Sequence, residues 1–360
     1  MYESEQSQTA QDWERRRQRR AESAELRRKQ KRQQLIILIA VAAALALVVF
    51  LVGMCLSGAG ANTVETEPTD EPTVPTTEPE PTMPPLAWMS FEDGREITAS
   101  QYFVYDVDAD TFLTISGEPT ETIYPASITK LFTAYVALQY LEPDAMITVG
   151  DALDLVVNKS SVAGIQPMEQ LSTEMLVEAM LLPSGNDAAC ALAVEIGRMM
   201  AGDTSLDPQS ASDLFVEEMN RQAQALGLNG THFANPDGIH LDTHYTTFQD
   251  LTLLGKLALE NPTIMKYAQV SRASITLESG EDRQWKNTNA LIDPNSDYYC
   301  NCAIGLKTGS TPRAGSCLLS AFECGDRTVI VGVFGCATDE DRFMDTLHLF
   351  NEALGYTDTM

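Results

Sequence analysis

The sequence predicts an α+β fold, in which an antiparallel sheet is flanked by helices and interrupted by a helical insert. Two pairs of apolar segments alternate around short polar turns, as β-hairpins do, at about 101–107 with 111–116 and 316–322 with 328–334. Between the hairpins, and again after the second one, apolar residues repeat at helical spacing. These segments are about 127–140, 174–182, 187–200, 211–227, 247–260 and 339–354.

The first predicted helix begins with a serine that can act as a nucleophile. Tyr124-Pro125-Ala126 interrupts the chain, so Ser127 lies at the start of a mostly buried helix. Lys130 follows one turn later on the same face, within reach of the Ser127 hydroxyl. Burial and a second cation, for which Lys307 is the candidate, would favour a neutral Lys130 that accepts the serine proton. For this motif alone, a serine N-cap followed by a surface lysine is the alternative.

A second polar turn lies between two predicted apolar helices. Ser184-Gly185-Asn186 follows the helix break at Pro183. Such a turn can direct a hydroxyl and an amide into a cleft, where Ser184 would pass a proton to the leaving nitrogen and Asn186 would orient Lys130 and a substrate amide. Ordinary turn chemistry is the alternative interpretation of this stretch.

The third motif, Lys307-Thr308-Gly309-Ser310, continues an apolar run that reads as a strand. Gly309 has no side chain, so a substrate could lie against the strand edge and pair with its backbone. Lys307 and Thr308 would offer a cation and a hydroxyl to a carboxylate. The backbone N–H groups of Ser127 and Ser310 are the candidate donors to a developing oxyanion. A polar hairpin is the alternative here.

The order and spacing of the three motifs fit a single serine acyl-transfer site, with 57 residues from Ser127 to Ser184 and 121 from Asn186 to Lys307. With these motifs the chain resembles the D-alanyl-D-alanine carboxypeptidases, low-molecular-mass penicillin-binding proteins of serine peptidase family S11, over about residues 98–355. The stretches that carry the resemblance are Pro125–Leu131, Leu182–Ala189, Phe233–Gly238, Asn287–Leu291 and Gly305–Gly309.

The resemblance implies a β-lactamase/transpeptidase-like fold and a penicillin-binding enzyme that removes the terminal D-alanine of peptidoglycan stem peptides. It implies that Ser127 is acylated by substrate or by β-lactams, and that Lys130 is the base. By the same resemblance, Lys307, Thr308 and Gly309 form the strand that binds the substrate carboxylate. Arg342 resembles a family arginine that helps to hold this carboxylate, with a surface arginine as the alternative.

The first 56 residues predict a single membrane span. Residues 1–34 carry 10 Lys/Arg and 6 Asp/Glu, and Leu35–Leu56 is then a stretch of 22 residues without a charge, which is long enough to cross a bilayer. The basic flank precedes the span, so we expect a cytoplasmic N-terminus and an extracellular catalytic domain. A secretory signal cleaved after Ala59-Gly60-Ala61 is the alternative, and it would give a secreted form.

Residues 57–85 are expected to form a disordered linker, because seven of the 24 residues from Asn62 to Pro85 are proline, interleaved with Thr and Glu. Residues 86–360 then form the catalytic domain. Many resembling enzymes continue into a second β-rich domain with a C-terminal membrane helix. Neither is seen here, so the N-terminal segment is expected to provide the anchor.

Composition argues against several partners and cofactors. The net charge of −27 makes nucleic acid an unsuitable partner. Cys190, Cys317 and Cys336 fall on predicted core faces, where free thiols pack as small hydrophobes, although the six exported cysteines also permit disulfides. Cys300-Asn301-Cys302 has no second ligand pair nearby, and the histidines show no zinc-protease motif, so we expect neither a metal nor another cofactor.

Two other functions remain open from the sequence. A β-lactamase would need a carboxylate that activates a deacylating water, and no E-x-x-L-N-type segment lies between Asn186 and Lys307. A non-catalytic penicillin sensor or wall-binding domain would bind penicillin without turnover of peptide. The balance between hydrolysis and transpeptidation cannot be derived from the motifs.

Overall fold

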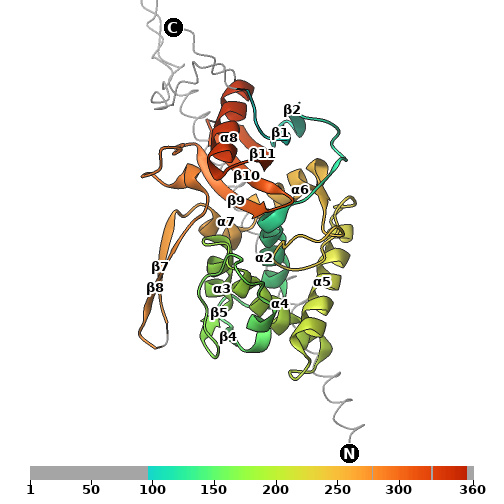
Figure 1. Ribbon diagram of the computed structural model, residues 1–360, viewed down its shortest axis with the longest axis vertical. Helices are drawn as coiled ribbons and strands as arrows, with labels where there is room; N and C mark the ends of the chain where they lie inside the picture. The colour runs from blue at the N-terminus through green and yellow to red at the C-terminus, as the bar shows by residue number, and fades with distance from the viewer. Residues whose placement is uncertain (1–95, 278, 326, 355–360) are drawn as a thin grey trace, which may run out of the picture. The chain divides into compact units, whose positions relative to one another are not determined.

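A five-stranded antiparallel sheet forms the centre of the fold (Figure 1). The computed structural model describes residues 96–277, 279–325 and 327–354. The strand order is β2-β1-β11-β10-β9, which leaves β9 as an edge strand. The strands are β1 Gln101–Asp106, β2 Thr111–Ile115, β9 Ala303–Thr311, β10 Gly315–Cys324 and β11 Arg327–Cys336.

Alternation along the strands gives the sheet two apolar faces. In β1, Phe103 packs into the larger core on the helical side, whereas Val104 packs into the core beneath α8 (Asp339–Ala353). Phe350 of α8 stacks on Phe322 of β10 with ring centroids 4.1 Å apart. Because successive side chains of a strand point to opposite faces, one run of apolar residues serves both layers.

The remaining helices form the layer that carries the first two motifs (Figure 1). A 3-10 turn, η1 (Ala126–Ile128), leads directly into α2 (Thr129–Tyr140), which is buried along most of its length. Its neighbours are α3 Thr173–Leu181, α4 Asn186–Ala201, α5 Pro208–Ala225, α6 Phe248–Leu259 and α7 Pro262–Ala268.

The predicted fold class and both predicted hairpins are confirmed, and the predicted helices are found within a few residues of their expected ends. The sequence interpretation missed α7 and several short strand pairs. The largest of these is the hairpin of β7 (Arg272–Thr276) and β8 (Asp282–Lys286). The other missed elements are β3 Thr122–Ile123, β4 Met146–Thr148, β5 Gln170–Ser172, β6 Thr246–Thr247, η2 Asp151–Leu155 and η3 Ala290–Ile292.

The predicted cytoplasmic tail, membrane span and linker, residues 1–34, 35–56 and 57–85, lie outside the described residues. In the part of the chain that is described, no helix is both long and apolar enough to cross a membrane. Within the same residues, no group of three His, Cys, Asp or Glu side chains could hold a metal ion.

The cysteines divide into one disulfide and four buried thiols. Cys302 and Cys324 are joined where β9 begins and β10 ends. The free thiols are Cys190, Cys300, Cys317 and Cys336. Burial raises the pKa of Cys317 to about 11 and that of Cys336 to about 12, so both remain protonated thiols at neutral pH.

Candidate active site

The candidate nucleophile and base are in direct contact. Lys130 Nζ lies 2.8 Å from Ser127 Oγ and donates a second hydrogen bond of 2.6 Å to the backbone carbonyl of Asp237. The contact arises because η1 and α2 are continuous, which places these two side chains one turn apart. Ser127 is partly exposed, whereas Lys130 is completely buried.

Burial lowers the pKa of Lys130 to about 8, although the carboxylates of Asp237 and Asp187 oppose this shift. At pH 7 about one tenth of the amine is therefore neutral, which is far more than for an exposed lysine. Lys307, the second cation expected to lower the pKa of Lys130, is not among the causes of that shift. Burial is the first cause of the lowered pKa of Lys307, and the charges of Lys130 and Arg342 lower it further.

The backbone around Ser127 is tightly enclosed. Ala126 has a φ of +49°, a left-handed conformation that costs a non-glycine residue on the order of 1–3 kcal/mol. Gly238 packs so closely that a Cβ built on it would lie 1.9 Å from the Ala126 carbonyl oxygen. On the other side, a Cβ on Gly309 would be 3.0 Å from the Ser127 nitrogen. The space left by the missing side chain of Gly309 therefore accommodates η1, and the pairing of a substrate with this strand edge stays a prediction.

The second motif occupies the turn between α3 and α4, as predicted. Ser184 has a φ of +64° and, like Asn186, is almost fully buried. The Asn186 side-chain oxygen is buried and has no hydrogen-bond partner among the described residues, so it remains available to a substrate N–H. No contact between Asn186 and Lys130 is seen within these residues. The Asp187 carboxylate accepts hydrogen bonds from the backbone N–H groups of Ala163, Gly164 and Ile165.

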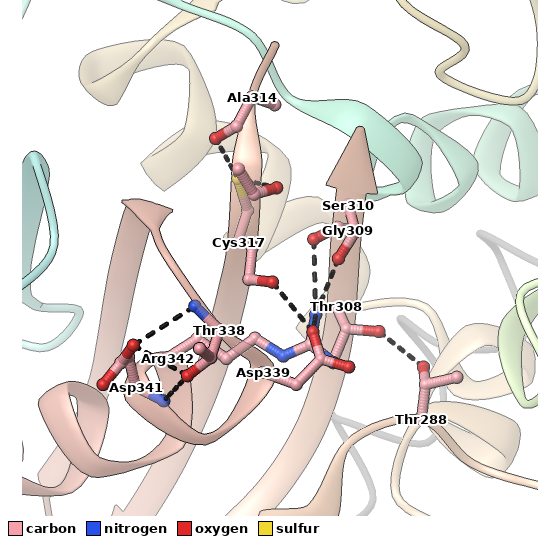
Figure 2. Close-up of polar contacts among 12 residues, drawn as sticks. Thr288, Thr308, Gly309, Ser310, Ala314, Cys317, Thr338, Asp339, Asp341 and Arg342 are labelled. Atoms are coloured by element: carbon pink, nitrogen blue, oxygen red, sulfur yellow. Dashed lines mark hydrogen bonds and ion pairs between the residues drawn. The ribbon is translucent and has the colours of Figure 1, made fainter. Parts of the chain in front are cut away.

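A further segment, which contains Thr288 and Asn289, connects the second motif to β9, the strand that carries the third motif. Thr288 donates its backbone N–H to the Leu182 carbonyl at 3.1 Å, just before the Ser184 turn. Its hydroxyl contacts the Thr308 hydroxyl of β9 (Figure 2). Asn289 extends the connection by donating from Nδ2 to the Gly305 carbonyl at 3.3 Å. Sequence reasoning recognised Asn287–Leu291 as a family-like stretch but gave it no role.

Arg342 is a buried residue of the site, so its interpretation as a surface arginine is wrong. It is 5% exposed, and its Nη1 lies 3.1 Å from Ser310 Oγ and 3.4 Å from the Gly309 carbonyl oxygen. Figure 2 shows its side chain extending from α8 toward β9, with Asp339 beside the guanidinium at 3.2 Å. Its buried Nε has no partner among the described residues, which leaves a donor for a ligand.

The strand of the third motif carries a fully buried lysine. Lys307 donates from Nζ to the Thr308 carbonyl at 3.0 Å. The residue before it, Leu306, has a φ of +77°. Three of the six described non-glycine residues with positive φ, Ala126, Ser184 and Leu306, therefore lie at or beside the three motifs. Such outliers collect at functional sites, where the surrounding structure holds them in place.

A role for His244 and Thr129 could not be read from the sequence. The two side chains are 2.8 Å apart although 115 residues separate them in the chain. The only signal was a threonine within the first motif and a histidine close to the Phe233–Gly238 stretch. Neither residue type indicates by itself that the two meet beside the nucleophile.

The chain is similar to D-alanyl-D-alanine carboxypeptidases along much of its length. The family profile described as D-alanyl-D-alanine carboxypeptidase matches residues 89–338. A D-alanyl-D-alanine carboxypeptidase of Streptomyces sp. (strain K15) is 35% identical over 237 residues, which are 62% of this chain and 77% of the relative. The carboxypeptidase DacF of Bacillus subtilis is 28% identical over 66% of this chain, and the match spans 58% of the relative.

Solved structures show the same similarity. The crystal structure of the Streptomyces K15 DD-transpeptidase matches 72% of this chain and 98% of its own, with a TM-score of 0.65 and 30% identity. Penicillin-binding protein D2 from Listeria monocytogenes, in its ampicillin-bound form, matches with a TM-score of 0.58 and 28% identity over 72% of this chain and 98% of its own. The family profile, which covers more than half of the residues, and the arrangement of the three motifs agree: the chain belongs to the D-alanyl-D-alanine carboxypeptidase family of serine peptidases, S11.

Proposed function

We propose that this penicillin-binding serine carboxypeptidase removes the terminal D-alanine of peptidoglycan stem peptides, with Ser127 as the nucleophile and Lys130 as the base. The observation that carries these roles is the 2.8 Å contact between Lys130 Nζ and Ser127 Oγ. A lysine whose pKa is lowered to about 8 can accept the serine proton at neutral pH, which an ordinary lysine does poorly.

In acylation, Lys130 takes the proton of Ser127, and Ser127 Oγ attacks the carbonyl carbon of the penultimate D-alanine. The backbone N–H groups of Ser127 and Ser310 stabilise the negative oxygen that forms. The C–N bond then breaks, and the proton passes through Ser184 to the departing nitrogen. In deacylation, water attacks the carbonyl carbon of the acyl-enzyme while Lys130 accepts one of its protons. The ester C–O bond to Ser127 then breaks, the proton passes from Lys130 to Ser127 Oγ, and the shortened peptide leaves.

Recognition of the substrate carboxylate is assigned to β9 and α8. Lys307 and Arg342 bring two positive charges to this side of the site, and Thr308 and Ser310 add hydroxyl donors. The partnerless Nε of Arg342 supports this role, because a guanidinium binds a carboxylate best when two of its N–H groups are available. On the opposite side of the scissile bond, the partnerless Asn186 oxygen would accept a substrate N–H.

We also propose that Leu35–Leu56 anchors the enzyme in the membrane, with residues 57–85 as a tether and residues 86–360 outside the cell. The apolar run and its basic flank support this topology. Protease added to intact cells should cut within the proline-rich tether and release a soluble, active fragment. A mature protein that begins at Asn62 and is found in the medium would instead identify a cleaved signal.

The activity is tested with the full chain purified in detergent. We expect it to release D-alanine from a peptide ending in Lys-D-Ala-D-Ala and to form a long-lived adduct with labelled penicillin. Rapid turnover of penicillin would identify a β-lactamase, and penicillin binding without peptide turnover would identify a sensor. Adding an amine acceptor and following the cross-linked product measures transpeptidation against hydrolysis.

A further inference from the structure

One face of α2 carries three buried polar side chains, Thr129, Lys130 and Thr133, and none of the three is exposed to solvent. Each contacts the same stretch of chain, residues 233–245. Lys130 donates to the Asp237 carbonyl, and Thr133 donates to the Pro236 carbonyl at 2.6 Å. Thr129 instead contacts a side chain, that of His244. The reaction described above uses only Lys130.

The contacts of His244 determine which of its ring nitrogens carries the proton. The Ala234 backbone N–H donates to Nδ1 at 3.2 Å, so Nδ1 is an acceptor without a proton. The proton of the neutral ring therefore lies on Nε2, which donates to Thr129 Oγ1 at 2.8 Å. His244 is only 2% exposed, and its burial lowers its pKa to about 3, so the ring is neutral at physiological pH.

Because the Thr129 hydroxyl accepts from His244, its own proton is free to be donated. It is donated to the Ala126 carbonyl oxygen at 2.8 Å. The backbone N–H of Thr129 also donates to this oxygen. Ala126 is the left-handed residue directly before Ser127, and Gly238 encloses the same carbonyl. A directed chain of hydrogen bonds thus runs from the Ala234 backbone through His244 and Thr129 to the peptide unit that leads into the nucleophile.

We propose that His244 and Thr129 are positioning residues, which act through the Ala126 carbonyl to hold Ser127 in line with Lys130. Rotation of the Ala126–Ser127 peptide unit would move both the Ser127 Oγ and the Ser127 N–H assigned to the oxyanion. The neutral imidazole fixes the orientation of the Thr129 hydroxyl. Because Nε2 donates to Thr129 Oγ1, the hydroxyl proton must point at the Ala126 carbonyl. This inference rests on the proposed function of Ser127 and adds two residues that do not touch the substrate.

The test compares buried threonines one turn apart on the same helix face. Thr129→Val removes the hydroxyl and keeps the shape, Thr129→Ser keeps the hydroxyl, and Thr133→Val removes an equally buried hydroxyl that contacts the Pro236 carbonyl instead of Ala126. The full chain is reacted with labelled penicillin over a range of concentrations, which separates the binding constant from the first-order acylation step. The melting temperature of each variant is measured in parallel.

We expect Thr129→Val to slow the acylation step about 10- to 100-fold while penicillin binding stays near wild type, because small misplacements of reacting atoms have effects of this size. Thr129→Ser should acylate close to the wild-type rate, and so should Thr133→Val, even where its melting temperature falls as far as that of Thr129→Val. His244→Gln, whose amide can still donate to Thr129, should retain more activity than His244→Leu. Wild-type acylation by Thr129→Val, or an equal loss in Thr133→Val, would overturn the proposal.

A spectroscopic measurement tests the same chain of bonds without turnover. In the ¹⁵N-histidine-labelled full chain, with His244→Gln used to assign the signal, the His244 resonances should show a neutral ring protonated at Nε2 throughout about pH 5 to 8. A proton on Nδ1, or titration within this pH range, would overturn the proposal. This measurement uses the wild-type chain, so it remains decisive if Thr129→Val does not fold. A wild type that is acylated but releases no D-alanine contradicts the proposed hydrolysis alone, whereas a wild type that is not acylated at Ser127 contradicts both proposals.

Discussion

Two walls of the candidate site each contain a completely buried lysine, yet the two amines differ in their neighbours and in the causes of their lowered pKa. The nucleophile wall consists of η1 and the start of α2, and the carboxylate wall consists of β9 with Arg342 of α8. Lys130 of the nucleophile wall has two oxygen partners and lies near carboxylates, and its pKa is about 8. Lys307 of the carboxylate wall has one carbonyl partner and lies near two cations, which lower its pKa beyond the effect of burial.

The difference in pKa arises from the charged neighbours of the two lysines and not from burial alone. The nucleophile wall keeps an amine whose pKa is close to neutral pH, as a base that must repeatedly take and return a proton requires. Lys130 and Arg342 lower the pKa of Lys307 in the carboxylate wall, and no carboxylate among the described residues raises it. A carboxylate bound beside Lys307 would supply a negative charge and raise the pKa of the lysine amine.

The largest effects are expected when the two reacting side chains of the nucleophile wall are substituted one at a time. Ser127→Ala should abolish covalent penicillin labelling while the protein still unfolds cooperatively, because only a partly exposed hydroxyl is lost. Lys130→Ala should slow acylation about 10²–10⁴-fold, which is the usual contribution of a positioned base. Mass spectrometry of the adduct and acylation kinetics give the two measurements. Label that persists on Ser127→Ala would place the nucleophile elsewhere.

The carboxylate wall should instead discriminate between substrates. Arg342→Ala should lower kcat/KM for D-Ala-D-Ala peptides about 10- to 100-fold, the size expected for hydrogen bonds to a charged group. Penicillin acylation should fall less, because the strained lactam ring supplies reactivity of its own. Lys307→Ala should impair both reactions, since the peptide and penicillin each carry a carboxylate for which Lys307 is a proposed partner. Unchanged peptide turnover by Arg342→Ala would remove that residue from the recognition of substrate.

The pH dependence of acylation sharpens the comparison between the two amines. The lowered pKa means that Lys130 is mainly protonated below about 8 and mainly neutral above it. The second-order rate constant of penicillin acylation should therefore rise about tenfold from pH 6 to pH 7, somewhat less from pH 7 to pH 8, and level off above. Stopped-flow measurements at constant ionic strength can follow this rise of the rate constant with pH. A plateau already reached near pH 6 would point to an amine with a lower pKa as the base.

Strong local patterns made much of the fold predictable. The β1–β2 and β10–β11 hairpins alternate clearly around polar turns, and α2 and α8 have continuous helical periodicity. The β7–β8 hairpin was missed because its hydrophobic pattern is weak. Among the described residues of its two strands, Ile275 and Trp285 are the only buried hydrophobic side chains. Much of its attachment is polar and non-local, through Arg283 to Glu169 and Trp285 Nε1 to the Ala163 carbonyl.

Residue patterns predicted the local contacts of the candidate site, whereas Arg342 was assigned to it only through the family resemblance. Ser127 and Lys130 meet because one helical turn separates them, and the sequence displays that spacing. Arg342 reaches β9 across 32 residues of chain, and His244 reaches Thr129 across 115, so neither contact leaves a periodic signal. The positive φ of Ala126 was equally hidden, since alanine gives no sign of a left-handed conformation.

The Cys302–Cys324 disulfide makes the strand that carries Lys307 depend on redox conditions. It closes a loop of 22 residues at the end of the β9–β10 hairpin away from Gly309, and cross-linking a loop of this length stabilises the folded state by about 3 kcal/mol. Disulfides persist in oxidising compartments and are reduced in most cytosols. Enzyme prepared in a reducing cytosol would therefore have a less stable β9–β10 edge than enzyme folded in an oxidising compartment, although the amino-acid sequence is the same.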